Sequence, residues 1–288
     1  MKRILIFGAS GMLGSTLYRF FINDPHYKTF GTIRNHSSSK YFKTNLQNSL
    51  ISNISLEEDK DIEAAFNIAK PDIVINCVGI IKQQSNANDI HANIIINAAL
   101  PHKLSKYCDI HCARFIHFST DCVFTGKHGF YKEEDEADSR DLYGVTKLLG
   151  EVSYGNTLTL RTSIIGHELN SSKSLIDWFL SQNDTIKGYK KAIFSGLPTI
   201  EIASVLKEYV IPNPRLFGLY HLSVDPINKY DLLSMVSQRY SKEINIIPDE
   251  SFKIDRSLNS DRFQIESGFK PKTWHNLIDY MYKDYISI

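Results

Sequence analysis

A glycine-rich turn near the N-terminus constrains the fold of this chain more than any other feature. The apolar run at residues 4–7 is followed by the sequence GASGMLG, which contains Gly8, Gly11 and Gly14, and then by an amphipathic segment. Such an unbroken apolar run is typical of a strand buried on both faces of a parallel sheet. Strand, glycine turn and helix together predict a dinucleotide-binding start, in which the backbone approaches a pyrophosphate at the helix N-terminus. A tight strand-to-helix turn that binds nothing is the alternative.

The residue after the second predicted strand bears on the choice of cofactor. That strand covers residues 29–33 and ends at Arg34, twenty residues past Gly14. A carboxylate at this place would hold the ribose hydroxyls of NAD, whereas an arginine suits the 2′-phosphate of NADP. We therefore expect NADP(H), with a solvated surface arginine as the alternative. The turn residues expected to bind this cofactor are Gly8, Ser10, Gly11, Met12, Leu13 and Gly14.

Two later strands bring further loops to the same edge of the sheet. The strand at 73–77 is followed by a small-residue turn, and the strand at 114–118 is followed by Ser119, Thr120 and Asp121. Open α/β sheets bind ligands at the carboxyl ends of their strands. We therefore expect the turn to lie by the nicotinamide side of the cofactor, through Cys77, Val78 and Gly79.

This alternation predicts an α/β protein with a Rossmann-type, doubly wound parallel sheet and a smaller C-terminal substrate-binding lobe. Residues 1–165 are expected to form the dinucleotide-binding domain. Residues 166–288 are expected to form most of the substrate-binding lobe, with segments that return to the first domain.

A tyrosine and a lysine four residues apart are the strongest candidates for chemistry. In a helix, Tyr143 and Lys147 would lie one turn apart on the same face. A free phenol has a pKa of about 10, and a nearby positive charge favours its ionised form, so such a tyrosine can exchange a proton near neutral pH. A solvated pair on an amphipathic helix is the alternative.

The composition and the lengths of the apolar runs argue against a nucleic-acid partner, a signal peptide and a membrane-spanning helix. Lys and Arg number 33 and Asp and Glu 32, for a net charge of +1, so we expect no nucleic-acid partner. The N-terminal apolar run is too short for a signal peptide, and no run approaches the length of about eighteen residues that a membrane helix needs. We therefore expect a cytoplasmic protein that does not bind membranes.

The four cysteines are too few to suggest a disulfide framework, so reduced thiols are expected. Cys108, His111 and Cys112 have a spacing that could place them on one helical face. Three close ligands without a second cluster are weak grounds for a zinc site, and we expect no metal.

Taken together, the glycine turn, Thr120 at a strand end and the Tyr143 and Lys147 pair resemble the extended short-chain dehydrogenase/reductase superfamily. The segments STDCVFTG, LYGVTKLLGE and LRTSIIG are similar to the dTDP-4-dehydrorhamnose reductase branch, whose members are sugar-nucleotide ketoreductases. A further similarity, in the segment SGLPT, extends the resemblance over nearly the whole chain.

The resemblance implies an NADPH-dependent oxidoreductase that reduces the C4 keto group of a dTDP- or UDP-linked 4-keto-6-deoxy sugar, for surface polysaccharides. It implies that Tyr143 protonates the developing alkoxide and that Thr120 hydrogen-bonds the substrate oxygen. Lys147 would lower the phenol pKa and hold the nicotinamide ribose. The residues implied in binding the sugar nucleotide are Asp121, Val123, Phe124, Lys187, Lys190, Lys191 and Arg256.

Cys122 distinguishes this chain from the related sugar-nucleotide 4,6-dehydratases. Those enzymes have a similar strand end followed by Asp and Glu, and here the second position is Cys122, so dehydration is not expected. Two alternatives to the reductase stay open: a sugar-nucleotide epimerase, and a non-catalytic NADP-binding regulatory subunit. A homodimer is possible by analogy with relatives, and the nucleotide, the sugar and the C4 configuration are left open.

Overall fold

The computed structural model describes residues 1–84 and 86–288, which divide into two compact units. The first unit consists of Met1–Ser119, Arg140–Leu160 and Phe217–Leu219, and the second of Thr120–Ser139, Arg161–Leu216 and Tyr220–Ile288. The domain boundary expected at residue 165 stays a prediction.

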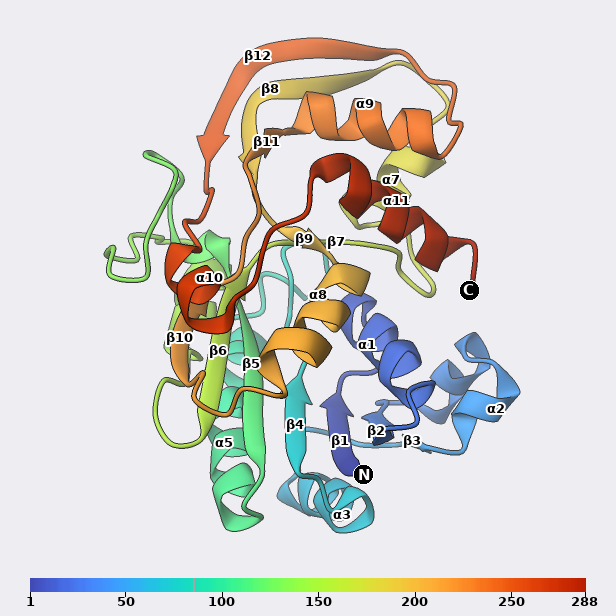
Figure 1. Cartoon of the computed structure of the whole chain (residues 1–288), viewed down its shortest axis with the longest axis vertical. Coiled ribbons are helices and arrows are strands. Elements are labelled where there is room, and N and C mark those ends of the chain that lie inside the picture. The colour runs from blue at the N-terminus through green and yellow to red at the C-terminus, as the bar shows by residue number, and fades with distance from the viewer. Residues whose placement is uncertain (85) are drawn as a thin grey trace. The chain divides into compact units, whose positions relative to one another are not determined.

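A seven-stranded sheet forms the centre of the first unit, with the strand order β10-β6-β5-β4-β1-β2-β3 (Figure 1). Its strands are β1 (Lys2–Phe7), β2 (Tyr27–Thr32), β3 (Leu50–Ile51), β4 (Ile73–Asn76), β5 (Arg114–Thr120), β6 (Thr157–Thr162) and β10 (Gly218–His221). The first five strands pair in parallel. The strand order reverses between β1 and β4, and this arrangement is the doubly wound Rossmann topology predicted from the sequence.

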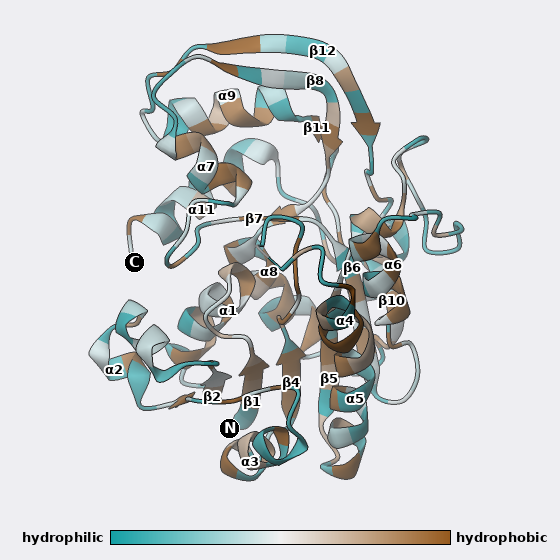
Figure 2. Cartoon of the chain, turned by 180° about the vertical axis from the view of Figure 1, so that it is seen from behind, coloured by the Kyte–Doolittle hydropathy of each residue, from teal (hydrophilic) through white to brown (hydrophobic). Residues whose placement is uncertain are grey.

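The sheet owes its stability to strands that are apolar on both faces. Ile4, Leu5, Ile6 and Phe7 of β1 are fully buried, and Figure 2 shows β1 and β4 coloured as hydrophobic. Burying each such side chain contributes about 1.5–3 kcal/mol. Leu5 and Phe7 belong to a core cluster that also contains Phe66 of α3 (Asp59–Ala69).

The remaining helices of the first unit connect these strands. They are α1 (Met12–Ile22), the 3₁₀ helix η1 (His36–Tyr41), α2 (Thr44–Gln47), α4 (Ile90–Asn93), the π-helix η2 (Ile94–Ala99), α5 (Leu100–Ile110) and α6 (Leu142–Leu149). The sequence of residues 90–107 predicts a long helical segment interrupted by Pro101, and the structure instead has a π-helical stretch, Ile94–Ala99, within it. Pro101 does not break it, because it lies in the first turn of α5, where a missing N–H is tolerated.

The second unit contains a three-stranded sheet, β11-β8-β12, and a two-stranded pair, β7-β9. Its elements are η3 (Asp121–Val123), β7 (Ile164–Ile165), α7 (Leu175–Ser181), β8 (Ile186–Phe194), β9 (Leu197–Pro198), α8 (Thr199–Val205), the π-helix η4 (Leu206–Val210), β11 (Ile227–Asn228), α9 (Lys229–Arg239), β12 (Ile246–Asp255), α10 (Asp261–Ser267) and α11 (Trp274–Tyr285). Among the described residues, no helix has the length and apolar character needed to cross a membrane.

Candidate active site

The glycine turn between β1 and α1 requires its glycines for steric reasons. Gly8 has a φ of +82°, in the left-handed region, and a Cβ on Gly8 would lie 2.8 Å from Val78 Cγ2. A Cβ on Gly14 would lie 2.1 Å from the Gly8 carbonyl oxygen, which no side chain can occupy. Gly11 is the N-cap of α1, and no side chain in the described part of the chain caps that helix. The first backbone N–H groups of α1 thus suit an anion such as a phosphate.

Arg34 lies two residues past the end of β2, where its side chain is exposed. It makes no hydrogen bond or ion pair with the other described residues of the chain. Its guanidinium is therefore available to a phosphate, as the sequence predicts for NADP, and that role stays a prediction.

The loop after β4 is held in place by a side chain from the π-helix η2. Asn97 is 1% exposed, and its Oδ1 accepts a hydrogen bond from the Ile80 N–H at 2.9 Å while its Nδ2 donates to the Ile80 carbonyl at 3.0 Å. A Cβ on Gly150, the C-cap of α6, would lie 1.9 Å from the Asn97 carbonyl oxygen. The backbone of Gly150 at the end of α6 therefore packs directly against the backbone of Asn97 in η2. The sequence shows Asn93 and Asn97 only as two polar residues at helical spacing in an apolar run, and Asn97 was not predicted as a site residue.

Lys147 is buried on α6, with 5% of its surface exposed. Its Nζ donates a hydrogen bond to the Phe118 carbonyl oxygen of β5 at 2.7 Å. Burial lowers the pKa of Lys147 to about 8, although the Glu151 carboxylate acts in the opposite direction. Burial raises the pKa of Cys77, which remains a neutral thiol beside the lysine. A lysine with this pKa can exchange its proton close to neutral pH.

Tyr143 lies one turn before Lys147 on α6 and is half-buried. The helix is capped by Asp141, whose Oδ1 accepts a hydrogen bond from the Gly144 N–H at 2.9 Å. Lys82, in the loop after β4, places its Nζ 2.8 Å from Asp141 Oδ2 and 5.6 Å from the centroid of the Tyr143 ring. The structure thus brings a second cation to the tyrosine. Lys82 was not among the predicted site residues, because its partner Asp141 is about sixty residues away in the sequence.

The end of β5 carries two hydroxyl side chains with different partners. Ser119 Oγ donates a hydrogen bond to Glu151 Oε1 at 2.6 Å within the first unit. Thr120 is grouped with the second unit, where its Oγ1 accepts from the Cys122 N–H at 3.1 Å and lies 3.2 Å from Asp121 Oδ1. The position of Thr120 relative to Tyr143 stays a prediction.

Asp121 is a buried carboxyl in the second unit, with 9% of its surface exposed. Burial raises its pKa, and Arg256 together with hydrogen bonds from Cys122 and Thr120 opposes that rise. The next two predicted substrate contacts, Val123 and Phe124, are fully buried. Phe124 stacks on Tyr131 with ring centroids 4.1 Å apart, so its side chain has a packing role whatever else it does.

The lysines predicted to bind the diphosphate have other partners. Lys187 is ion-paired with Asp249 at 2.9 Å, and Lys191 with Glu250 at 2.8 Å, between β8 and β12. Lys190 lies over the Tyr230 ring at 5.0 Å. All three lysines lie on β8, where they are exposed. Arg256 behaves differently, since its Nε donates to the Phe124 carbonyl oxygen at 2.7 Å.

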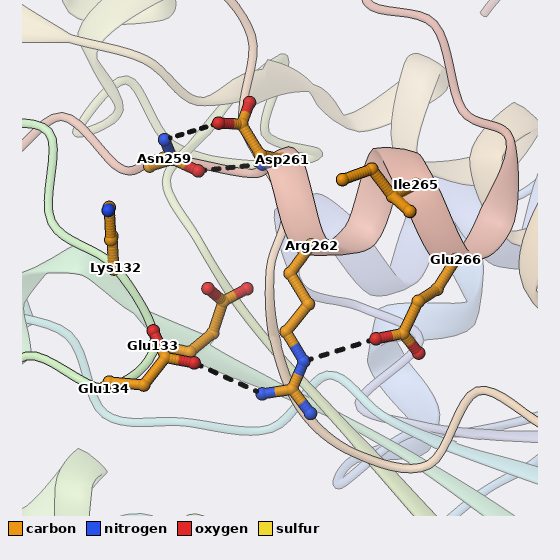
Figure 3. A pocket seen from close by; sticks show the side chains of 8 residues that line it. All are labelled: Lys132, Glu133, Glu134, Asn259, Asp261, Arg262, Ile265 and Glu266. Atoms are coloured by element: carbon orange, nitrogen blue, oxygen red, sulfur yellow. Dashed lines mark hydrogen bonds and ion pairs between the residues drawn. The ribbon is translucent and has the colours of Figure 1, made fainter.

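A charged pocket of about 390 Å³ in the second unit contains none of the predicted site residues. It is lined by Lys132, Glu133, Glu134, Asn259, Asp261, Arg262, Ile265 and Glu266. Figure 3 shows Arg262 between Glu134 and Glu266, with ion-pair distances of 3.8 and 3.5 Å. Four carboxylates against two cations disfavour a phosphate group, so this pocket is a poor site for a nucleotide.

The cysteines and histidine considered for zinc do not form a cluster. Cys108 lies within α5, which ends at Ile110, and Cys112 follows with a φ of +54°. In residues 1–84 and 86–288, no group of three His, Cys, Asp or Glu side chains is placed to hold a metal ion.

A glycine turn at the switch point of a doubly wound sheet defines a nucleotide-binding α/β fold, and Tyr143 and the buried Lys147 on one helix stay the predicted proton-transfer pair. The chain belongs to the family described as the RmlD substrate binding domain, whose model matches residues 1–286. The family resemblance predicted from the sequence is thereby confirmed.

Several named proteins are similar to this chain over most of its length. A dTDP-4-dehydrorhamnose reductase from Aggregatibacter actinomycetemcomitans is 23% identical over 304 residues, which span 96% of this chain and 97% of that protein. Methionine adenosyltransferase 2 subunit beta from Mus musculus is 27% identical over 316 residues, which span 96% and 89% respectively. The solved structure of a dTDP-4-dehydrorhamnose reductase from Bacillus anthracis, in complex with NADP, has a TM-score of 0.79 at 17% identity and covers 99% of both chains. This likeness confirms the predicted fold class.

Proposed function

We propose that this protein is an NADPH-dependent sugar-nucleotide ketoreductase that reduces the C4 keto group of a dTDP- or UDP-linked 4-keto-6-deoxy sugar. The observation that carries the proposal is the buried Lys147 one turn from Tyr143, in a Rossmann-type unit with a glycine turn. The named reductase relative and the NADP complex of the Bacillus anthracis structure support the reaction and the cofactor.

Each part of the candidate site then has a defined task. The N–H groups at the start of α1 bind the cofactor diphosphate, and Arg34 binds the 2′-phosphate. A bound nicotinamide supplies the hydride. Thr120 turns its hydroxyl from Asp121 to the substrate carbonyl oxygen, and Tyr143 donates a proton to the alkoxide that forms. One proton of the Lys147 ammonium is held by the Phe118 carbonyl, which leaves the others for the nicotinamide ribose and the phenol.

The test is NADPH oxidation by the purified protein with a panel of dTDP- and UDP-linked 4-keto-6-deoxyhexoses. Tyr143→Phe removes the proton donor, so we expect turnover to fall about 100-fold or more with little change in NADPH affinity. Phe130→Leu is a matched control, because Phe130 is an exposed aromatic side chain outside the candidate site. Undiminished turnover by Tyr143→Phe would refute the mechanism.

A non-catalytic NADP-binding subunit is a second candidate, and the relative named methionine adenosyltransferase 2 subunit beta favours it. This reading predicts tight NADP binding with no turnover of any sugar nucleotide in the panel. The epimerase alternative predicts an isomerised keto sugar with no net NADPH consumption. The same assay, followed by product analysis, therefore separates the three functions. A place in surface polysaccharide synthesis, a cytoplasmic location and a homodimer stay predictions.

A further inference from the structure

Lys229 is a half-buried cation in the second unit that the sequence does not single out. It is the first residue of α9, and its ammonium makes no hydrogen bond or ion pair with any other residue that the structure describes. Burial lowers its pKa, while Asp121 and Cys122 act in the opposite direction. Lys229 directly follows Asn228 of β11, which pairs with Ile193 of β8, and Ile193 pairs on its other side with Asp255 of β12, the residue before Arg256. A partly buried ammonium without a hydrogen-bonding partner is costly. Its presence beside the end of β5 therefore calls for a ligand that compensates it.

Arg256 follows the last residue of β12, on the other side of β8 from Lys229, and is fixed by the backbone around it. Its Nε donates to the Phe124 carbonyl oxygen at 2.7 Å, and its Nη1 lies 3.6 Å from Cys122 Sγ. The chain just before it is tied down as well, since the Asp255 N–H donates to the Gly126 carbonyl oxygen at 2.9 Å. Nη2 of Arg256 has no hydrogen-bonding partner in the described part of the chain. One face of the guanidinium thus remains for a ligand.

The charges around this group do not balance. Lys229 and Arg256 supply two positive charges, and the facing carboxyl is Asp121, which burial holds toward its neutral form. The summed charge of these three side chains is therefore positive whether Asp121 is ionised or protonated. The exposed lysines of β8 offer no such site, because Lys187 and Lys191 are already ion-paired.

We propose that Lys229 and Arg256 together bind an oxyanion of the substrate, and that this oxyanion is a phosphate of its nucleoside diphosphate. The choice of a nucleoside diphosphate rests on the proposed function. Lys229 contributes a point charge with three donors, and Arg256 a planar fork whose orientation is already set. Lys229 thereby joins Arg256 as a substrate-binding residue of the second unit.

Calorimetric titration of the full-length protein with UDP and with dTDP, without NADPH, tests the proposal. We expect Lys229→Gln to weaken binding of the nucleoside diphosphate about tenfold or more, and Lys229→Arg to restore most of the affinity. Lys270→Gln is the matched control, since Lys270 is an exposed lysine of the same unit outside the candidate site. It should change the affinity less than about twofold.

The outcomes separate this proposal from the reductase activity. Loss of UDP or dTDP affinity in Lys229→Gln with recovery in Lys229→Arg supports the phosphate site, even if no keto sugar is reduced. Unchanged affinity in Lys229→Gln overturns it, even if NADPH oxidation is observed. A third arm titrates a hexuronic acid: if Lys229→Gln loses affinity for that sugar and keeps it for the nucleotides, the oxyanion is a sugar carboxylate and the phosphate assignment is wrong. If Lys229→Gln does not fold, wild-type affinity for UDP that is insensitive to ionic strength overturns the proposal.

Discussion

Replacing Lys147 by methionine should abolish reduction and, at neutral pH, make the protein more stable. The fall of the Lys147 pKa from 10.5 to about 8 measures what it costs to bury the ammonium. At about 1.36 kcal/mol per pKa unit, this cost is about 3 kcal/mol near neutral pH. Methionine has a similar shape and loses only the hydrogen bond to the Phe118 carbonyl oxygen, which contributes about 1 kcal/mol. We therefore expect Lys147→Met to raise the free energy of unfolding by about 2 kcal/mol.

The pH dependence isolates the charge from other effects of the substitution. Between the folded pKa of about 8 and the unfolded value of 10.5, the unfolded chain binds a Lys147 proton that the folded chain has lost. Stability therefore rises with pH through this window. The linkage relation gives a gain of about 2.5 kcal/mol between about pH 7 and about pH 10 in the wild type, which Lys147→Met lacks.

Urea unfolding at the two pH values measures both quantities. The advantage of Lys147→Met over the wild type should be largest at the lower pH and should nearly vanish at the higher one. Lys106→Met serves as the control, because Lys106 is an exposed lysine on α5 and should show no such convergence. If the difference between wild type and Lys147→Met is the same at both pH values, Lys147 does not carry a buried, destabilised charge and the argument fails.

Two further predictions concern the cofactor site. Gly14→Ala places a methyl group 2.1 Å from the Gly8 carbonyl oxygen, so NADPH affinity measured by fluorescence titration should fall about tenfold or more. Gly11→Ala is the control, and its effect should be much milder because the nearest contact of the added methyl group is 3.5 Å. Equal losses of affinity in the two variants would contradict the steric argument. Arg34→Asp replaces the group expected at the 2′-phosphate, so the ratio of NADPH to NADH affinity should fall about tenfold or more, and an unchanged ratio would place the phosphate elsewhere.

Local sequence signals predicted the first unit well. The apolar run of β1 and the glycines after it identify a Rossmann-type start, because both the burial of a parallel strand and a strand-to-helix turn leave a mark within a few residues. The pair of Tyr143 and Lys147 was likewise visible, since four residues in a helix define one face. The burial that lowers the Lys147 pKa was not visible, because it depends on β5 and on the loop after β4.

The sequence was less informative where partners are distant. Asn97 and Lys229 carry no motif, and their positions follow from contacts with residues far away in the chain. The basic segment around Lys190 was interpreted as a phosphate site because it is rich in lysine. In the structure it is β8, where Lys187 and Lys191 point to the same side by strand alternation and pair with carboxylates on β12. The strand β12 (Ile246–Asp255) is ten residues long, since pairing with β8 extends it through polar positions that show no strand pattern in the sequence.

The contact between Gly150 and the Asn97 carbonyl oxygen has a consequence for motion. No side chain separates the backbones of Gly150 and Asn97, so the end of α6 cannot shift along η2 without a steric clash. We therefore expect the end of α6 and η2 to move together. The loop after β4 should move with them, because it is joined to Asn97 by two hydrogen bonds. We therefore expect Tyr143 and Lys147 to keep a constant geometry to that loop during local fluctuations of the chain.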